Sequence, residues 1–138
     1  MATIPVKPIL LKDAAFIVEA DNYEGHVSTV RFDPSVSTTS WQGMTPSASF
    51  TDQSAATWAA ALNYAQDWET PDSLARYLYD HEGETVTVRF APKKGTGLPE
   101  VTADIVVVPG PIGGDVNAYM TGSVTLGVSG RPVLGVTA

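Results

Sequence analysis

Most of the chain shows the spacing of apolar and polar residues that is typical of β-strands, with side chains alternating between a buried and an exposed face. The segments with this alternation, or with runs of β-branched and apolar residues, are 9–20, 26–32, 84–92, 101–110 and 117–133. A turn-like sequence at 21–25 separates the first two, so we predict that they pair as a hairpin. The Gly/Pro-rich segment 109–115 is predicted to join the last two strands.

Residues 55–66 fit two periodicities. Their alanines favour a helix, and Trp58 and Leu62 have helical spacing. However, Trp58, Leu62 and Tyr64 also lie on one face of a strand, where alternate residues point the same way. We predict a strand.

One helix is predicted at about 71–82. Thr70 is a suitable N-cap, Pro71 suits the first helical position, and Asp72 would lie in the first turn, where negative charge favours the helix dipole. The apolar stripe of this helix comprises Leu74, Tyr77 and Leu78. Gly83 is expected to end it.

Residues 33–53 are rich in Ser and Thr and have few apolar anchors. This composition predicts a long, mobile loop or an extended arm. Loops of such length are uncommon in compact domains unless they have a function.

These elements together predict one domain over 1–138, because a chain of this length can bury a core that is stable alone. The predicted fold is mainly β, an antiparallel β-sandwich or barrel with one flanking helix.

The charge balance limits the possible partners. Eight Lys and Arg against fifteen Asp and Glu give a net charge of −7, and the densest cationic spot is Lys93–Lys94. Tight binding of nucleic acid is therefore not expected, because such binding neutralises phosphates with clustered cations. No cysteine is present, which excludes disulfides and thiolate chemistry. Residues 1–16 have neither a signal-peptide layout nor the length of a membrane span, so folding in a cytosol is expected.

Six carboxylates lie within residues 66–84: Asp67, Glu69, Asp72, Asp80, Glu82 and Glu84. The predicted helix separates the first three from the last three by roughly 12 Å. The acids therefore do not form one catalytic group, and the spacing of a calcium-binding loop is missing. A zinc site would need both histidines, His26 and His81, plus a carboxylate, and neither lies in a ligand motif. No catalytic residue, metal or cofactor is predicted, and the chain is not expected to be an enzyme.

Two stretches suggest a family. They are "YAQDWETPDSLARYLYDHEGETVTVRFAP" (64–92) and, after a Gly/Pro-containing crossover, "MTGSVTLGVSGRPV" (120–133). The "QDW", the helix start "P-x-S-L", the strand end "F-x-P" and the closing "G-x-P" of Gly130–Pro132 resemble the major tail tube protein of long-tailed, siphovirus-type phages, especially phages of actinobacteria. The resemblance covers roughly 48–134 and its motifs are structural.

The resemblance implies a virion protein with a tail-tube fold. Six copies would close into a ring, and the rings would stack into a tube that carries DNA to the host without sequence-specific binding. Its partners would be a tape-measure protein, a tail terminator and distal tail or baseplate proteins. The protein would be assembled in the host cytoplasm and located in the virion tail. A net negative charge suits such a channel, because a like-charged wall does not attract the phosphate backbone.

The segment 33–53 resembles the inter-ring loop of that family. Its candidate contact residues are Ser37, Thr38, Thr39, Ser40, Trp41, Gln42, Gly43 and Met44. Asp104 and Asp115, around the last hairpin, are expected to face the channel.

Three other classes stay open. The chain is alternatively a tail terminator, head–tail connector or capsid-decorating protein. It is also compatible with the tube subunit of a type VI-like or contractile-injection system. An enzyme or carbohydrate-binding module is the third class.

Overall fold

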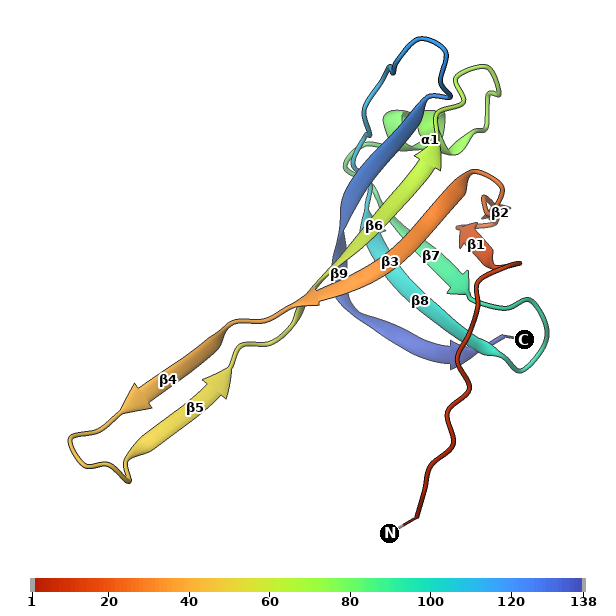
Figure 1. The fold of residues 1–138 in the computed structure, drawn as a ribbon. Helices are drawn as coiled ribbons and strands as arrows, with labels where there is room; N and C mark the ends of the chain where they lie inside the picture. The colour runs from red at the N-terminus through yellow and green to blue at the C-terminus, as the bar shows by residue number, and fades with distance from the viewer. Residues whose placement is uncertain (1, 138) are drawn as a thin grey trace.

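A computed structural model describes residues 2–137, and its largest element is a seven-stranded antiparallel sheet that curls into an open barrel (Figure 1). The strand order in this sheet is β2-β1-β7-β8-β9-β6-β3, and β4 and β5 form a separate pair. The elements are β1 (Ala15–Val18), β2 (Asp21–Asn22), β3 (Val27–Ser35), β4 (Thr38–Gln42), β5 (Ser49–Gln53), β6 (Thr57–Ala65), α1 (Leu74–Asp80), β7 (Thr85–Ala91), β8 (Pro99–Val106) and β9 (Thr121–Val136). The predicted fold class, mainly β and antiparallel with one helix, is confirmed.

The core is built from alternate positions of the central strands, as the sequence pattern predicts. Its strand residues include Ala60, Leu62 and Tyr64 of β6, Val86 and Val88 of β7, Ala103 and Ile105 of β8, and Val124 and Leu126 of β9. Neighbouring strands meet in register, with Leu62 opposite Val124 and Ala60 opposite Leu126. The strand prediction for 55–66 is therefore confirmed, with β6 paired on both sides.

The predicted hairpin between 9–20 and 26–32 is wrong. β1 has only four residues and pairs with β2 and β7, whereas β3 pairs with β6 at the opposite edge of the sheet. β3 pairs with β6 because the two strands match in length and their apolar residues lie opposite each other. The nine residues of β3 match the nine of β6, and Val30 lies opposite the buried Leu62.

The helix is shorter than the predicted 71–82. Its N-cap is Ser73, which has an extended backbone and whose side-chain oxygen accepts the N–H of Arg76. Neither Thr70 nor Pro71 therefore has the predicted role. Asp72 precedes the cap, and no acidic residue lies in the first turn. The helix ends at Asp80, and Gly83 follows it with a φ of 85°, a left-handed conformation that favours glycine. Leu74, Ala75 and Leu78 are the buried face of the helix.

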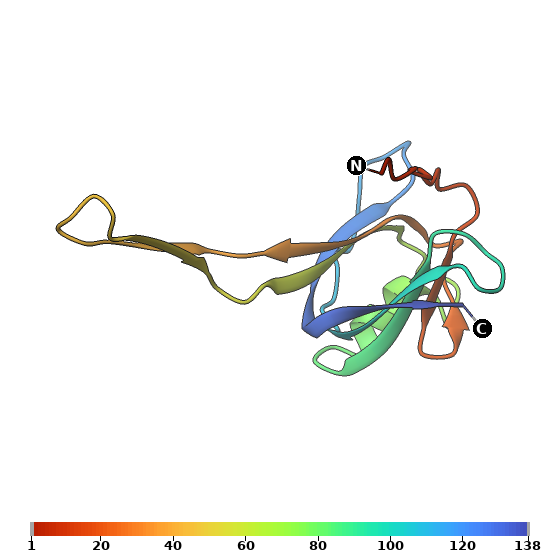
Figure 2. The ribbon, with the colours of Figure 1, turned by 90° about the horizontal axis from the view of Figure 1, so that it is seen from below.

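β6 has a different structure at each end (Figures 1 and 2). Beyond its last residue the chain leads into α1, which packs its apolar face into the core. Before its first residue lies the hairpin of β4 and β5, which projects from the barrel as an arm. We call residues 36–56 the arm. The segment predicted as a long loop or extended arm is thus an ordered two-stranded hairpin.

Candidate assembly surfaces

The arm has no core of its own. Every residue of β4 and β5 is exposed, and the register places Trp41 opposite Phe50, with exposed fractions of 66% and 64%. An isolated two-stranded hairpin is marginally stable at best in water. The arm extends about 30 Å beyond Ser35, at roughly 3.3 Å per residue, and packs against nothing in its own chain. Its apolar side chains are therefore available to another molecule.

All eight predicted contact residues lie in the arm. Ser37 precedes β4, Thr38, Thr39, Ser40, Trp41 and Gln42 form β4, and Gly43 and Met44 begin the turn that leads to β5. The return strand was missed, and with it Phe50 and Asp52. The alternation of Ser49, Phe50, Thr51 and Asp52 was the available signal, because it mirrors β4 across a turn that contains Gly and Pro.

Most side chains on the outward face of the sheet are small and neutral. Across β3, β6 and β9 the register forms the rows Thr29–Asn63–Ser123, Arg31–Ala61–Thr125 and Asp33–Ala59–Gly127. Arg31 and Asp33 pair with each other at 3.1 Å, so their charges compensate. We call these rows the outward face. Apart from this ion pair, its side chains present hydroxyl, amide and methyl groups.

The two predicted channel acids lie in different places. Asp104, on β8, is exposed and accepts a hydrogen bond of 2.7 Å from the Thr87 hydroxyl. It lies opposite Ser129 of β9, next to the outward face. Asp115 lies in the loop 107–120, at the helix end of the barrel (Figure 1). The structure does not bring the two acids together.

Several strand edges lack partners within the described residues, and two of them are long. β3 ends the sheet on one side, so one edge of its nine residues is unpaired. β9 has a second free edge, which faces the same side of the sheet, because β6 stops pairing with β9 at Gly127 and the remainder of β9 pairs only with β8. Gly130, with a φ of 84°, lies where the β8–β9 register shifts, so β9 bends there. Long unpaired edges are sites where another strand can add.

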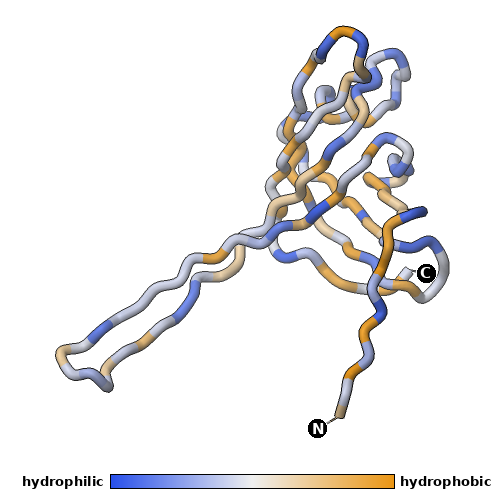
Figure 3. Tube along the Cα trace, in the orientation of Figure 1, coloured by the Kyte–Doolittle hydropathy of each residue, from blue (hydrophilic) through white to orange (hydrophobic). Residues whose placement is uncertain are grey.

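Apolar residues with exposed side chains gather in four segments outside the core. The hydropathy colouring in Figure 3 shows apolar stretches in the segment before β1 and in the loop 107–120. The exposed residues are Ile4, Val6, Ile9, Leu10 and Leu11 before β1; Val36, Trp41, Met44 and Phe50 in the arm; Ile112, Val116, Tyr119 and Met120 in the loop 107–120; and Val133, Leu134 and Val136 at the end of β9. Soluble monomers seldom expose so many, and such patches mark interaction sites.

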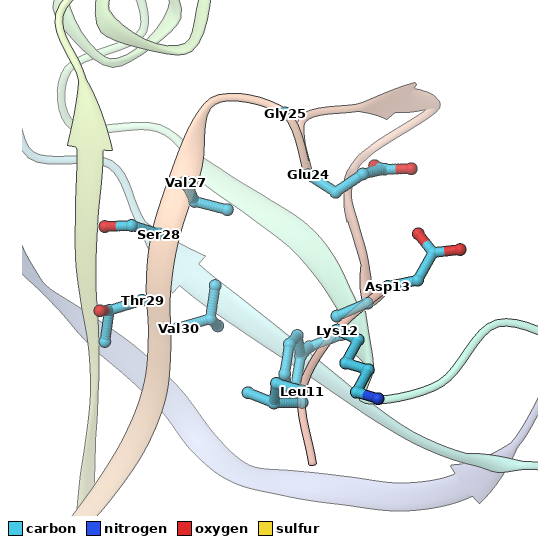
Figure 4. A pocket seen from close by; sticks show the side chains of 11 residues that line it. Leu11, Lys12, Asp13, Glu24, Gly25, Val27, Ser28, Thr29 and Val30 are labelled. Atoms are coloured by element: carbon cyan, nitrogen blue, oxygen red, sulfur yellow. The ribbon is translucent and has the colours of Figure 1, made fainter.

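A hollow of about 340 Å³ separates the two edges of the curled sheet (Figure 4). Leu11 reaches it from the segment before β1, and Val30 reaches it from β3. At its rim Lys94 binds Asp13 at 3.0 Å and Glu24 at 3.5 Å. The hydrogen bond to Asp13, aided by the charge of Glu24, raises the pKa of Lys94. These carboxylates therefore serve as partners of one lysine.

The residues of "QDW" (66–68) have structural roles. The Gln66 side chain is buried, donates to the carbonyls of Gly113 and Thr121 at 3.0 and 2.7 Å, and accepts from the N–H of Gly113 at 3.0 Å. The indole N–H of Trp68 also donates to Gln66, at 3.3 Å. Gln66 thus ties the loop 107–120 to the end of β6.

Asp67 organises the approach to the helix. Its carboxylate accepts the backbone N–H groups of Glu69 and Thr70 at 3.0 and 3.1 Å. Hydrogen bonding from Thr70, through its side chain and its backbone, lowers the pKa of Asp67. The carbonyl of Asp67 accepts the hydroxyl of Ser73, the helix cap. Asp67 therefore stabilises the turn before the helix and supports the helix cap.

Both histidines pack against tyrosines. His81 stacks on Tyr77 at 4.1 Å between ring centroids, Tyr77 lies 6.1 Å from Tyr23, and Tyr23 meets His26 edge-on at 5.6 Å. Burial is the main cause of the raised pKa values of both tyrosines. Within residues 2–137 no three His, Asp or Glu side chains are placed to hold a metal ion. In the same residues no helix has the length and apolar character needed to cross a membrane.

The geometry defines a class of small antiparallel barrels that carry one helix, a projecting hairpin and unpaired edges. A solved structure with this fold is a chain of the PVC sheath–tube complex, an extracellular contractile injection system in its extended state. The two chains superpose with a TM-score of 0.66 over 94% of this chain and 93% of that one, at 14% sequence identity. At that identity the likeness establishes a shared fold. No protein-family model matches the sequence, and no curated protein matches it.

Proposed function

We propose that this chain is a structural subunit that assembles with its own copies into a tube of the phage-tail type. The observation that carries the proposal is the arm, an ordered hairpin with an exposed Trp41–Phe50 pair and no contact with its own core. A hairpin of this kind needs a surface supplied by another molecule. The shared fold with a chain of a sheath–tube complex supports a tube as the assembly.

The unpaired edges support a ring. The two long ones belong to β3 and to the distal half of β9, so pairing of the first with the second between copies would join unlike surfaces. Head-to-tail contacts of this kind close into rings when the rotation fits. Six copies per ring, as the tail-tube resemblance implies, are part of the proposal, and the arm then links one ring to the next.

The outward face is the proposed channel wall. Its rows carry Ser, Thr, Asn, Ala and Gly, and its one ion pair is internally compensated. Such a wall offers no clustered cations to hold a phosphate backbone, and Asp104 adjoins it. Passage of DNA without sequence-specific binding is consistent with this chemistry. The tape-measure, terminator and baseplate partners, and location in a virion tail, also belong to the proposal.

The proposed role is not catalytic. Asp67 and Ser73 are engaged in the turn and cap before α1, and His26 and His81 in stacking against tyrosines. A screen against hydrolase substrates and glycans tests this part. Activity that disappears on changing Asp67 or Glu69 would contradict it.

Electron microscopy of the purified protein over a range of concentrations tests the proposal. We expect hollow filaments of constant diameter that appear above a threshold concentration. A matched variant replaces residues 36–56 by Asn-Gly, joining Ser35 to its cross-strand partner Thr57. This variant should be a folded monomer without filaments. Single rings from the full chain would favour a terminator, and normal tubes from the armless variant would exclude the arm as the stacking element.

A tube subunit of a contractile injection system is the second candidate, favoured by the structural likeness. In native particles that contain this protein, a tube surrounded by a contractile sheath would favour it. A bare tube attached to a capsid would favour the siphovirus-type tail.

A further inference from the structure

The two faces of the arm differ in chemistry. Cross-strand partners share a face, so one face carries Thr39, Trp41, Phe50 and Asp52. The opposite face carries Thr38, Ser40, Gln42, Ser49, Thr51 and Gln53, which are all polar and uncharged. Only the first face has large apolar groups, and it also has the single charged residue found between positions 34 and 66.

A second hollow, of about 290 Å³, lies at the end of the barrel from which the arm leaves. It is lined by Val30, Phe32, Trp58, Phe90, Val101, Arg131, Pro132 and Leu134. We call it the end hollow. A cavity of roughly 150 Å³ is enough to hold a benzene ring, so the end hollow has room for an aromatic side chain. Leu134 at its rim is 81% exposed.

Arg131 is the one charged residue in the lining of the end hollow. Within residues 2–137 it forms no ion pair, and neither does Asp52 of the arm. The arm therefore offers two aromatic rings beside one acid, and the hollow offers an apolar wall beside one base.

We propose that the end hollow receives the Trp41–Phe50 face of the arm of a second copy, with Asp52 of that arm paired to Arg131. This rests on the proposed tube assembly and names the surface on which the arm docks. Burial of the rings would provide most of the affinity, and the charge pair would set the register of the contact.

The chain's own arm does not reach this site. The arm begins at the hollow, since Ser35 pairs with Thr57 and the next residue, Trp58, lines the wall. From there the hairpin runs away from the barrel, carrying Trp41 with it (Figures 1 and 2). A second copy is therefore needed.

The exposed apolar segment before β1 is the competing occupant. Between residues 2 and 11 its only charged side chain is Lys7, which would bring a cation toward Arg131. Charge complementarity thus favours the arm.

Charge exchange tests the pair. R131E and D52R should each raise the threshold concentration for assembly, measured by light scattering and sedimentation, by about tenfold or more. The double variant R131E/D52R should return most of the way to the wild-type threshold. On the polar face of the arm, T38A/Q53A is the matched control and should assemble normally. Single variants that assemble like wild type, or a double variant no better than the worse single, would overturn the proposal.

Crosslinking tests the position, because the natural chain has no cysteine. F50C/L134C should form disulfides between copies on mild oxidation, giving a ladder of oligomers, whereas S49C/L134C on the polar face should not. Efficient crosslinking of I4C/L134C in place of F50C/L134C would assign the hollow to the N-terminal segment and reject the arm. If the crosslinked pairs form but the protein makes no tubes, the docking proposal stands and the tube proposal is rejected. If the wild type makes tubes and the charge variants assemble as it does, only the docking proposal is rejected.

Discussion

Gly110, in the loop after β8, lies directly against the hydroxyl of Tyr64 on β6. A Cβ at position 110 would overlap that oxygen, and Tyr64 is fully buried and has no room to withdraw. This contact explains why a glycine is required where the loop 107–120 passes over the core.

Gly110→Ala is expected to destabilise the fold by about 1–3 kcal/mol, the range for overpacking a core. Urea unfolding of the armless variant, which is the proposed monomer, would measure the loss. Gly127→Ala is the matched control, because a Cβ there meets nothing within 4 Å. Adding Tyr64→Phe should recover part of the loss, and equal effects at 110 and 127 would disprove the clash.

Gln66→Leu should lower the free energy of unfolding, measured by chemical denaturation, by about 2–4 kcal/mol. The change leaves the N–H of Gly113 and the carbonyls of Gly113 and Thr121 without their side-chain partner. Hydrogen exchange should show the loop 107–120 opening first, since Gln66 holds it. On the exposed arm, Gln53→Leu is the control and should change the free energy of unfolding by no more than about 0.5 kcal/mol. A loss of stability below about 0.5 kcal/mol for Gln66→Leu would mean that water replaces the hydrogen bonds of Gln66.

Ser73→Ala should destabilise by about 1–2 kcal/mol, because Ser73 caps α1 through Arg76 and donates to the carbonyl of Asp67. Thr70→Ala tests the alternative cap that the sequence suggested and should cost less. Chemical denaturation of the two variants compares them directly. A larger loss of stability for Thr70→Ala than for Ser73→Ala would support Thr70 as the N-cap and the longer predicted helix.

The helix boundary shows how far local signals reach. Thr70 and Pro71 satisfy the usual rules for a helix start, yet Ser73 takes the cap because its hydroxyl also reaches the carbonyl of Asp67. That second contact depends on how the chain turns after β6, and the turn depends on the carboxylate of Asp67. Composition and spacing therefore predicted the helix and its buried leucines but not its first residue.

Strand pairing was less predictable than strand location. The alternation in β3, β6 and β7 was visible in the sequence because each has one face on the core. The partner of β3 was not visible, because sequence neighbours such as β1 compete with distant strands and the longer apolar match prevails. The end hollow was invisible for the same reason, since Phe32, Phe90 and Leu134 come from three strands.

Acid should weaken the fold partly through Asp67. Its pKa is lowered in the folded protein from an ordinary value of 3.8, so its ionised form contributes stability above that pH, and the contribution is lost as pH falls through the lowered folded value. Asp67→Asn keeps an oxygen for the N–H groups of Glu69 and Thr70 but does not titrate. Unfolding midpoints measured from pH 6 down to pH 2 should therefore fall less steeply for this variant. The same substitution at exposed Asp80 is the control, and parallel pH profiles for wild type and Asp67→Asn would reject the linkage.

The outward face can be located in an assembled tube by cysteine labelling, because the natural chain has no cysteine to remove. Ser123 lies in a neutral row beside Asn63, and Asp80 lies at the exposed end of α1, so the two labelling variants are Ser123→Cys and Asp80→Cys. If the outward face lines the channel, a maleimide carried on a large dextran should label position 123 in dispersed subunits but not in tubes. Position 80 should react in both states, since the helix packs on the core side of the sheet. A small maleimide should still reach position 123 in tubes through their open ends, which separates steric exclusion from burial between subunits. Equal labelling of both positions by the dextran reagent in tubes would place this face on the outside and leave the channel wall to another surface.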